Sequence, residues 1–188
     1  MKTLLTSIFV LCFGISTLQA ATWAIDGAHS NINFKIRHLS LSTVTGSFGS
    51  FNGTIQYDPE KPNEGSASIT IQIASINTGN AKRDSHLNNE DFFDSPKWPT
   101  ATFESTSWKQ TGENTFEITG DLTMHGQTHP ITLQTELLGT VDTQRGVKSG
   151  WEATTTLDRY EWNIGGEGGA QIGREVELDI NVQAIQQS

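Results

Sequence analysis

The stretch that decides the fold is TFEITGDLTMHGQTHPITLQTEL, residues 115–137. Phe116, Ile118 and Leu122 share one parity, and the residues between them are mostly polar or charged. A period of two is typical of a β-strand with one buried face. The alternation stops at Gly126-Gln127 and then resumes, and a glycine between two alternating runs predicts a tight turn. The segment therefore predicts an antiparallel β-hairpin.

The same alternation recurs along most of the chain. A polar face on each run and short turns between the runs favour an antiparallel sheet whose apolar face must be covered. About eight strands are too many for one helix to cover, so the sheet must close on itself as a sandwich or a barrel. No repeat or linker divides residues 21–188, which predicts one domain. The alternating runs are 31–38, 51–57, 67–73, 101–105, 116–124, 131–141, 151–157 and 176–184.

The N-terminus has the layout of a secretory signal peptide. Lys2 gives a positive start, residues 4–11 are almost continuously apolar, and Ala20 ends a small-residue cleavage pattern. The apolar run is far shorter than the roughly 20 residues that span a bilayer. We expect residues 1–20 to be removed and the protein to reside in the periplasm. Cys12 is the single cysteine and lies in this segment, so the mature chain has no thiol.

The charge balance bears on partners. The chain has 12 Lys and Arg against 21 Asp and Glu, a formal net charge of −9 at pH 7. Repulsion from phosphate makes nucleic acid an unfavourable partner. Adsorption to an anionic lipid surface is disfavoured for the same reason.

Two segments break the strand rhythm. Residues 81–94 carry no alternation and predict a short helical segment around residues 82–94, with Asp84 or Ser85 as its N-cap. Residues 165–173 are rich in glycine and predict a loop.

Three groupings of residues could suggest chemistry. His125 and His129 flank a predicted turn without a third ligand, so we expect no metal site. Asp84-Ser85-His86 holds the letters of a hydrolase triad, but triad members come from separate elements. No strand places two carboxylates inward. We therefore expect no catalytic residues, no catalytic cofactor and no enzyme activity.

Large apolar residues dominate the predicted inner face. An eight-stranded barrel has an interior that side chains can fill or that can hold one ligand. Periodicity does not separate a lined cavity from a packed core, so both alternatives stay open at this point. The large inward residues are Phe34, Phe48, Phe51, Phe103, Phe116, Met124 and Trp151, joined by Phe92, Phe93 and Trp98 from the irregular segment.

Several short motifs resemble one known family across nearly the whole mature chain. They start with Trp23-Ala24-Ile25-Asp26 and His29-Ser30, and they continue through Gly46-Ser47-Phe48. The most specific stretch holds Ser75-Ile76-Asn77-Thr78-Gly79, Arg83-Asp84, His86-Leu87, Asp91-Phe92-Phe93-Asp94 and Trp98-Pro99. This combination resembles the YceI-like polyisoprenoid-binding proteins. The sequence departs from the family pattern at Tyr160-Glu161-Trp162-Asn163, which alters one rim and with it the head group accepted.

The resemblance implies an all-β, eight-stranded antiparallel lipocalin-like barrel with an apolar pore. It implies binding of a long-chain isoprenoid lipid, a polyprenyl phosphate or a ubiquinone-like quinone, for sequestration, transport or storage in the periplasm. A quinone-carrying partner of a membrane redox enzyme and a stress-induced structural protein with a filled core are the alternatives. The expected tail contacts are Phe34, Ile36, Phe48, Leu87, Phe92, Phe93, Phe103, Met124 and Trp151, and the expected polar contacts near a mouth are His38, Arg83 and His86.

Other partners stay open. Transient contact with the membrane or with a membrane redox protein is compatible with a lipid carrier. A homodimer is also compatible with this role. For Arg83, a salt bridge to Asp84 or Asp94 competes with a head-group contact.

Overall fold

The computed structural model describes residues 20–166 and 171–187. The expected signal peptide lies outside this part except for Ala20, and so does the middle of the glycine-rich loop. No helix within the described ranges has both the length and the apolar character needed to cross a bilayer. The strands are β1 (Ala21–Ile25), β2 (Asn31–His38), β3 (Ser42–Phe48), β4 (Phe51–Tyr57), β5 (Ser66–Gln72), β6 (Ile76–Asn77), β7 (Thr100–Gln110), β8 (Thr115–Met124), β9 (Gln127–Thr143), β10 (Gly146–Asp158) and β11 (Ile172–Gln186).

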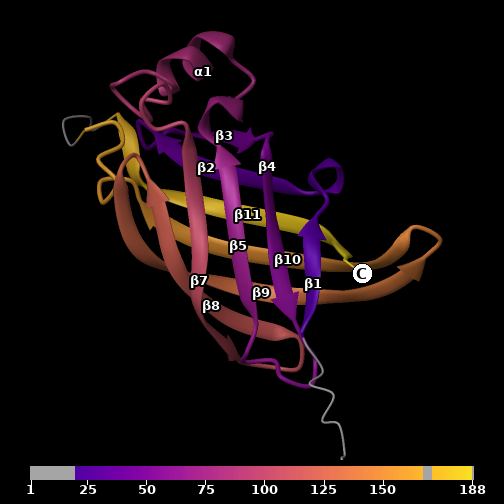
Figure 1. The fold of residues 1–188 in the computed structure, drawn as a ribbon. Helices are drawn as coiled ribbons and strands as arrows, with labels where there is room; N and C mark the ends of the chain where they lie inside the picture. Colours follow the sequence, from indigo (N-terminus) through magenta and orange to yellow (C-terminus); the bar gives the residue numbers. More distant parts are fainter. Residues whose placement is uncertain (1–19, 167–170, 188) are drawn as a thin grey trace, which may run out of the picture.

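Eight of these strands form a closed antiparallel barrel (Figure 1). The ring runs β1-β4-β5-β7-β8-β9-β10-β11, and β1 then pairs with β11, with Ile25 opposite Ala184. The predicted eight-stranded barrel is thereby confirmed. The hairpin of residues 115–137 forms β8 and the first part of β9, with Met124 opposite Gln127 across the predicted turn.

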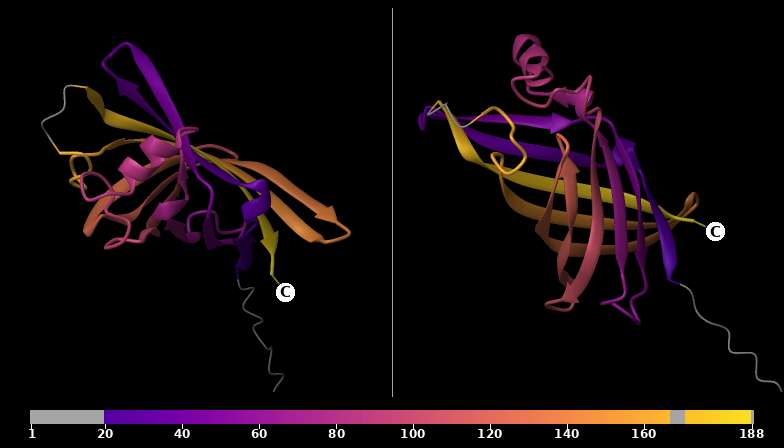
Figure 2. Two further views of the ribbon diagram at one scale, coloured as in Figure 1. Left: turned by 90° about the horizontal axis from the view of Figure 1, so that it is seen from above. Right: turned by 60° about the vertical axis from the view of Figure 1, so that its left-hand side comes forward.

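Strands β2, β3 and β6 extend the sheet beyond the ring. The C-terminal part of β11 pairs with β1, whereas residues 172–181 of β11 pair with β2. Strand β3 then pairs with β2, and the short β6 pairs with β3. The two views in Figure 2 show the β2–β3 hairpin projecting from one end of the barrel and the β9–β10 hairpin from the other. One strand therefore serves both the closed ring and its extension.

The corner between β1 and β2 is fixed by hydrogen bonds to Gln183 on β11. The Asp26 backbone N–H donates to the Gln183 carbonyl at 2.8 Å, and the Gln183 backbone N–H donates to Ser30 Oγ at 2.9 Å. The Gln183 side-chain amide donates to Asp26 Oδ2 at 3.0 Å. Asp26 also caps the 3-10 helix Gly27–His29, accepting from the backbone N–H of Ala28. Polar residues thus satisfy the backbone where the chain leaves β1 and turns into β2.

The irregular segment begins with α1 (Ala81–Leu87) and continues through turns to Pro99. Its N-cap is Asn80, whose side chain accepts from the backbone N–H of Arg83. The expectation that Asp84 or Ser85 caps the helix is wrong. Asp84 instead lies in the first helical turn and binds the backbone N–H of Thr78 at 2.8 Å, which ties the helix to the end of β6.

Four aromatic rings pack together inside the barrel and form what we call the aromatic plug: Tyr57, Trp108, Phe116 and Trp151. All six ring pairs among them have centroids between 5.2 and 6.1 Å apart. Such pairs add stabilisation beyond their buried area. Burial raises the pKa of the Tyr57 phenol above its ordinary value. The plug is the solid part of the barrel interior.

The corner carboxylate predicts a pH-dependent stability. The hydrogen bond donated by the His29 ring, together with those from Ala28 and Gln183, holds the pKa of Asp26 below its ordinary value of 3.8. A lowered carboxyl pKa stabilises the fold above pH 3.8, and that contribution is lost as pH falls through the folded-state pKa. We expect Asp26→Asn to lower the melting temperature at pH 7 and to differ less from the parent as pH falls below 3.8.

Thermal unfolding followed by circular dichroism across pH 2–7 measures this. The Asp121→Asn variant serves as a control because Asp121 is an exposed carboxylate on β8, away from the corner. A difference between Asp26→Asn and the parent that stays constant with pH would contradict the account.

Candidate ligand-binding site

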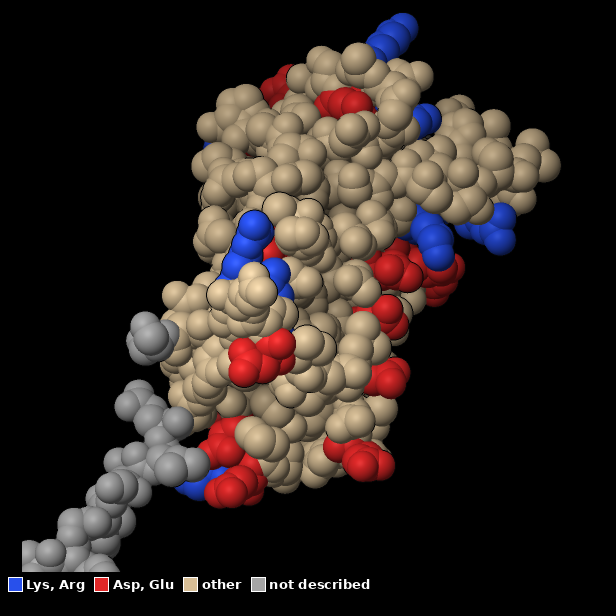
Figure 3. All heavy atoms as spheres, turned by 90° about the vertical axis from the view of Figure 1, so that its right-hand side faces the viewer, with Lys and Arg blue, Asp and Glu red and all other residues tan. Residues whose placement is uncertain are grey.

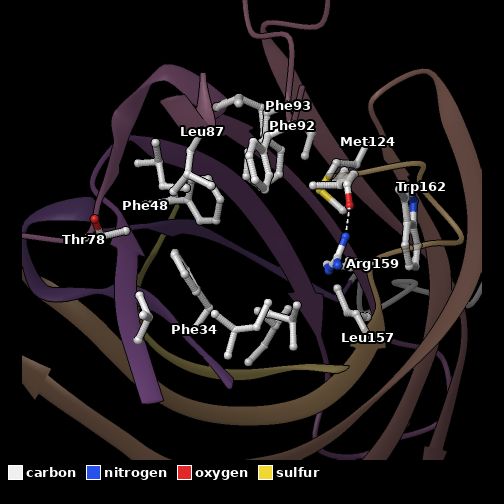
Figure 4. Close-up of a pocket in the computed structure, with 18 of the residues that line it drawn as sticks. Phe34, Phe48, Thr78, Leu87, Phe92, Phe93, Met124, Leu157, Arg159 and Trp162 are labelled. Carbon is white, nitrogen blue, oxygen red and sulfur yellow. Dashed lines mark hydrogen bonds between the residues drawn. The ribbon is translucent and has the colours of Figure 1, made fainter. Parts of the chain in front are cut away.

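An apolar cavity of about 180 Å³, here called the outer cavity, lies inside the barrel beneath α1. Figure 4 shows Phe92 and Phe93 reaching into it from the irregular segment, opposite Phe34 of β2. Phe34, Ile36 and Val44 contribute from the β2–β3 hairpin, because their parity faces the interior. The Phe34 ring lies over Gly46, where a Cβ would come 2.4 Å from Phe34 Cζ. A bare backbone at residue 46 is what leaves room for this ring.

A second apolar cavity of about 120 Å³, here called the inner cavity, lies deeper in the barrel. Four residues line both cavities, and we call them the constriction: Ile32, Ile71, Leu122 and Leu178. The inner cavity ends against Trp108 and Trp151 of the aromatic plug. The two cavities therefore follow one another along the barrel interior.

The cavity volumes decide between the two alternatives for the barrel interior. Packed protein cores contain few voids larger than a water molecule, which needs roughly 10–15 Å³. An apolar cavity of about 150 Å³ is large enough to hold a benzene ring. Both cavities are well above the volume that one water molecule needs, and the outer cavity also exceeds the volume that holds a benzene ring. The interior is therefore lined rather than filled between the aromatic plug and α1.

Most of the predicted contact residues surround these cavities. Two lie deeper than the rest: Phe103 and Trp151 line the inner cavity. His86 lines neither cavity; it is exposed, and its ring donates to Asp91 at 3.2 Å and packs edge-on against Phe92. The predicted residues at the outer cavity are Phe34, Ile36, His38, Phe48, Arg83, Leu87, Phe92, Phe93 and Met124.

Polar side chains border the outer cavity at β2 and at α1. His38 is half-buried at the end of β2. On α1, Arg83 donates from Nε to Thr78 Oγ1 at 2.7 Å and from Nη2 to the Thr78 carbonyl at 2.8 Å. Neither competing salt bridge, to Asp84 or to Asp94, forms within the described residues. Nη1 of Arg83 has no hydrogen-bond partner in the described part of the chain, so a donor beside the cavity remains available.

Arg159 is a cavity-lining cation that the sequence pattern does not predict. Its side chain is 4% exposed, and it donates to five acceptors, four of them backbone carbonyls. No carboxylate accepts from it within the described residues; the neighbouring Asp158 binds Arg174 instead, and that hydrogen bond lowers the pKa of Asp158. The acceptors are the carbonyls of Ile164, Gly166, Ile172 and Gly173 and the hydroxyl of Tyr160.

Trp162 is fully buried and lines the outer cavity next to Arg159. Its indole N–H donates to the Leu122 carbonyl at 3.1 Å, and its own carbonyl accepts from the His125 ring at 2.9 Å. The His129 ring packs edge-on against Trp162 at 5.2 Å. Both histidines therefore position this tryptophan. No group of three His, Cys, Asp or Glu side chains placed to hold a metal occurs within residues 20–166 and 171–187.

Comparison with known proteins identifies the family. The model of the YceI-like domain matches residues 23–184. The chain belongs to the YceI family. It is 40% identical over 180 residues to Protein YceI of Escherichia coli O157:H7, covering 94% of this chain and 93% of that protein. It is 41% identical over 172 residues to a UPF0312 protein of Ectopseudomonas mendocina, covering 90% of each.

Solved structures share the YceI fold. BcnA of Burkholderia cenocepacia superposes with a TM-score of 0.77 at 25% identity, over 85% of this chain and 98% of that one. The YceI protein of Campylobacter jejuni gives 0.74 at 30% identity, over 81% and 90%. A polyisoprenoid-binding domain from Saccharophagus degradans gives 0.69 at 16% identity, over 90% and 100%, and shares the fold.

Arg159 predicts a strong dependence of stability on one buried cation in this YceI-like domain. Removing it leaves several buried carbonyls without donors, and each such loss costs about 1–3 kcal/mol. We expect Arg159→Gln to lower the free energy of unfolding by more than about 2 kcal/mol. Urea unfolding followed by tryptophan fluorescence measures this.

Arg145→Gln is the matched control, since Arg145 is exposed in the turn between β9 and β10 and should change stability by less than about 0.5 kcal/mol. Equal midpoints for the two variants would show that the Arg159 hydrogen bonds do not hold the barrel end together.

Proposed function

We propose that this protein binds a long-chain isoprenoid lipid, with the tail in the outer and inner cavities, and carries or stores it in the periplasm. The observation that supports this most is the pair of consecutive apolar cavities ending at the aromatic plug. Membership of the YceI family adds support. So does the fold shared with a domain described as polyisoprenoid-binding. The proposal includes no catalytic step.

The apolar tail supplies most of the affinity. Each methylene that leaves water contributes roughly 0.8 kcal/mol, so ten such units supply about 8 kcal/mol before ordering costs are subtracted. Affinity of this origin does not require many head-group contacts. The cavities hold only part of a long isoprenoid tail at once. The rest of the tail must either push the constriction residues apart or extend out of the outer cavity at its polar border.

The head group lies at the polar border of the outer cavity. Nη1 of Arg83 is one donor available there, and the exposed Arg37 and the half-buried His38 lie on the same border. Arg159 adds a positive charge to the wall while its own donors stay engaged. Three arginines line the outer cavity, Arg37, Arg83 and Arg159, and cations beside an apolar cavity favour an anionic head group, such as a polyprenyl phosphate, over a neutral quinone.

The constriction predicts selection by tail length. Leu178→Phe places a larger ring between the two cavities and should shut off the inner one. We expect affinity for long polyprenyl chains to fall about tenfold or more, because several methylenes lose their burial, while chains short enough for the outer cavity bind as before.

Val147→Phe is the control, since residue 147 is half-buried and lines neither cavity. Titration with fluorescent prenyl lipids of graded length gives both affinities. A Leu178→Phe variant that lowers affinity equally for all lengths, or for none, would exclude the inner cavity as the tail site.

The head-group assignment predicts a charge-dependent loss. Arg83→Gln removes a cation whose charged hydrogen bond to phosphate is worth about 1.5–3 kcal/mol. We expect affinity for a polyprenyl phosphate to fall about tenfold or more, with a smaller change for a quinone bearing the same tail.

Lys82→Gln changes the neighbouring exposed cation on α1 and should leave both affinities unchanged. Competition binding measures the two ligands in one assay. Equal losses for phosphate and quinone in Arg83→Gln would place the head group elsewhere.

A further inference from the structure

The tip of the β2–β3 hairpin, residues 39–41, exposes two leucines to solvent. Leu39 is 48% exposed and Leu41 is 85% exposed. Only two other large apolar side chains in the described part are exposed, Leu138 and Val141, both on β9 near the opposite end of the molecule. We propose that this hairpin tip docks on an anionic phospholipid bilayer, so that lipid passes between the membrane and the outer cavity.

The backbone of the tip shows that its leucines are not needed to form the turn. Leu39 and Ser40 have φ values of 53° and 56°, and the Leu41 N–H donates to the His38 carbonyl at 3.0 Å. Two-residue turns in this left-handed region favour asparagine and glycine, which adopt it with less strain. Leu39 therefore occupies a strained turn position, and both leucines are exposed rather than packed into the core. A functional contact outside the molecule accounts for both features.

The tip continues directly from the wall of the outer cavity. His38, the last residue of β2, lines that cavity and pairs with Ile172 at the start of β11. The Leu39 N–H donates to the Gln171 carbonyl at 2.7 Å, which fixes the tip beside the N-terminal end of β11. Figure 2 shows this hairpin projecting beyond the barrel. A surface that receives the tip would therefore lie next to the cavity border.

The charge of the hairpin differs from that of the whole chain. Residues 27–57 contain no Asp or Glu, although the chain has 21 of them. The hairpin carries Lys35, Arg37 and His38 instead. On the neighbouring β11, Glu177 is paired to Lys35, and Glu175 lies in the bulge between the pairs Ile172–His38 and Val176–Ile36. Figure 3 shows the hairpin as a projection at the upper right, mostly without charged atoms, with basic groups below it and acidic groups next to those.

These features favour a bilayer over other occupants. Leucines inserted below the head groups and cations at the level of the phosphates match the two layers of an anionic membrane surface. The net charge of −9 disfavours adsorption of the protein as a whole, but residues 31–48 of the hairpin itself contain no Asp or Glu. The purpose of the docking rests on the proposed function, but the docking itself can be measured separately.

The test is flotation of the mature protein with vesicles of phosphatidylethanolamine and phosphatidylglycerol. We expect the parent to float with these vesicles and to float much less with phosphatidylcholine alone. The double variant Leu39→Ser, Leu41→Ser should partition at least about tenfold less, because two leucines lose their insertion. The matched control is Leu138→Ser with Val141→Ser on β9, near the opposite end of the molecule, and it should float as the parent does. Circular dichroism verifies that all variants are folded.

A second readout reports insertion directly. Leu41→Trp should show a blue-shifted difference emission with the anionic vesicles and quenching by brominated lipid, whereas Val141→Trp should show neither. Three results would overturn the docking proposal: the parent does not float, the Leu39 and Leu41 variant floats as well as the parent, or the Leu138 and Val141 control loses flotation equally. Uptake of polyprenyl phosphate from detergent, without vesicles, tests the proposed function separately, so either proposal can fail while the other stands.

Discussion

The pairing of β1 with the C-terminal part of β11 is the interaction on which the cavity depends. It closes eight strands into a ring, while the rest of β11 pairs with β2 and lengthens the wall at one end. The hydrogen bonds among Asp26, Ser30 and Gln183 fix the point where β11 changes partner. Without that change the inward faces of β2 and β3 would not surround the outer cavity.

The interior of this barrel changes in character along its length. The aromatic plug fills one region with four rings, and the inner and outer cavities follow it. Arg159 then binds the carbonyls of Ile164, Ile172 and Gly173 at the outer end, with no carboxylate among its acceptors in the described residues. A buried cation without a carboxylate partner is costly by itself. An anionic ligand beside it would offset part of that cost.

The strand period predicted much of this architecture, and its limits have physical causes. Alternation at Phe116, Ile118 and Leu122 identified the inner face because the side-chain period of a strand is two. The same alternation could not separate a cavity from a packed core, since both present apolar side chains inward.

Residues outside the strand pattern were harder to predict. Arg159 was not predicted because a charged residue next to Asp158 is usually exposed. Its burial is possible because backbone carbonyls accept its hydrogen bonds, and the strand pattern does not show these acceptors. His86 was expected near the cavity, but the turn of α1 directs its ring to Asp91. The N-cap residue was predicted wrongly because Asn80 and Asp84 both offer capping oxygens, and Asp84 binds Thr78 instead.

Native mass spectrometry of the protein purified from the cells that produce it, followed by lipid extraction, tests the central claim most directly. We expect a protein ion heavier than the mature chain by the mass of one polyisoprenoid lipid, which extraction releases and identifies. A protein that carries no lipid, and that takes up none when polyprenyl phosphate and isoprenoid quinone are offered, would contradict the claim that these cavities are a lipid site.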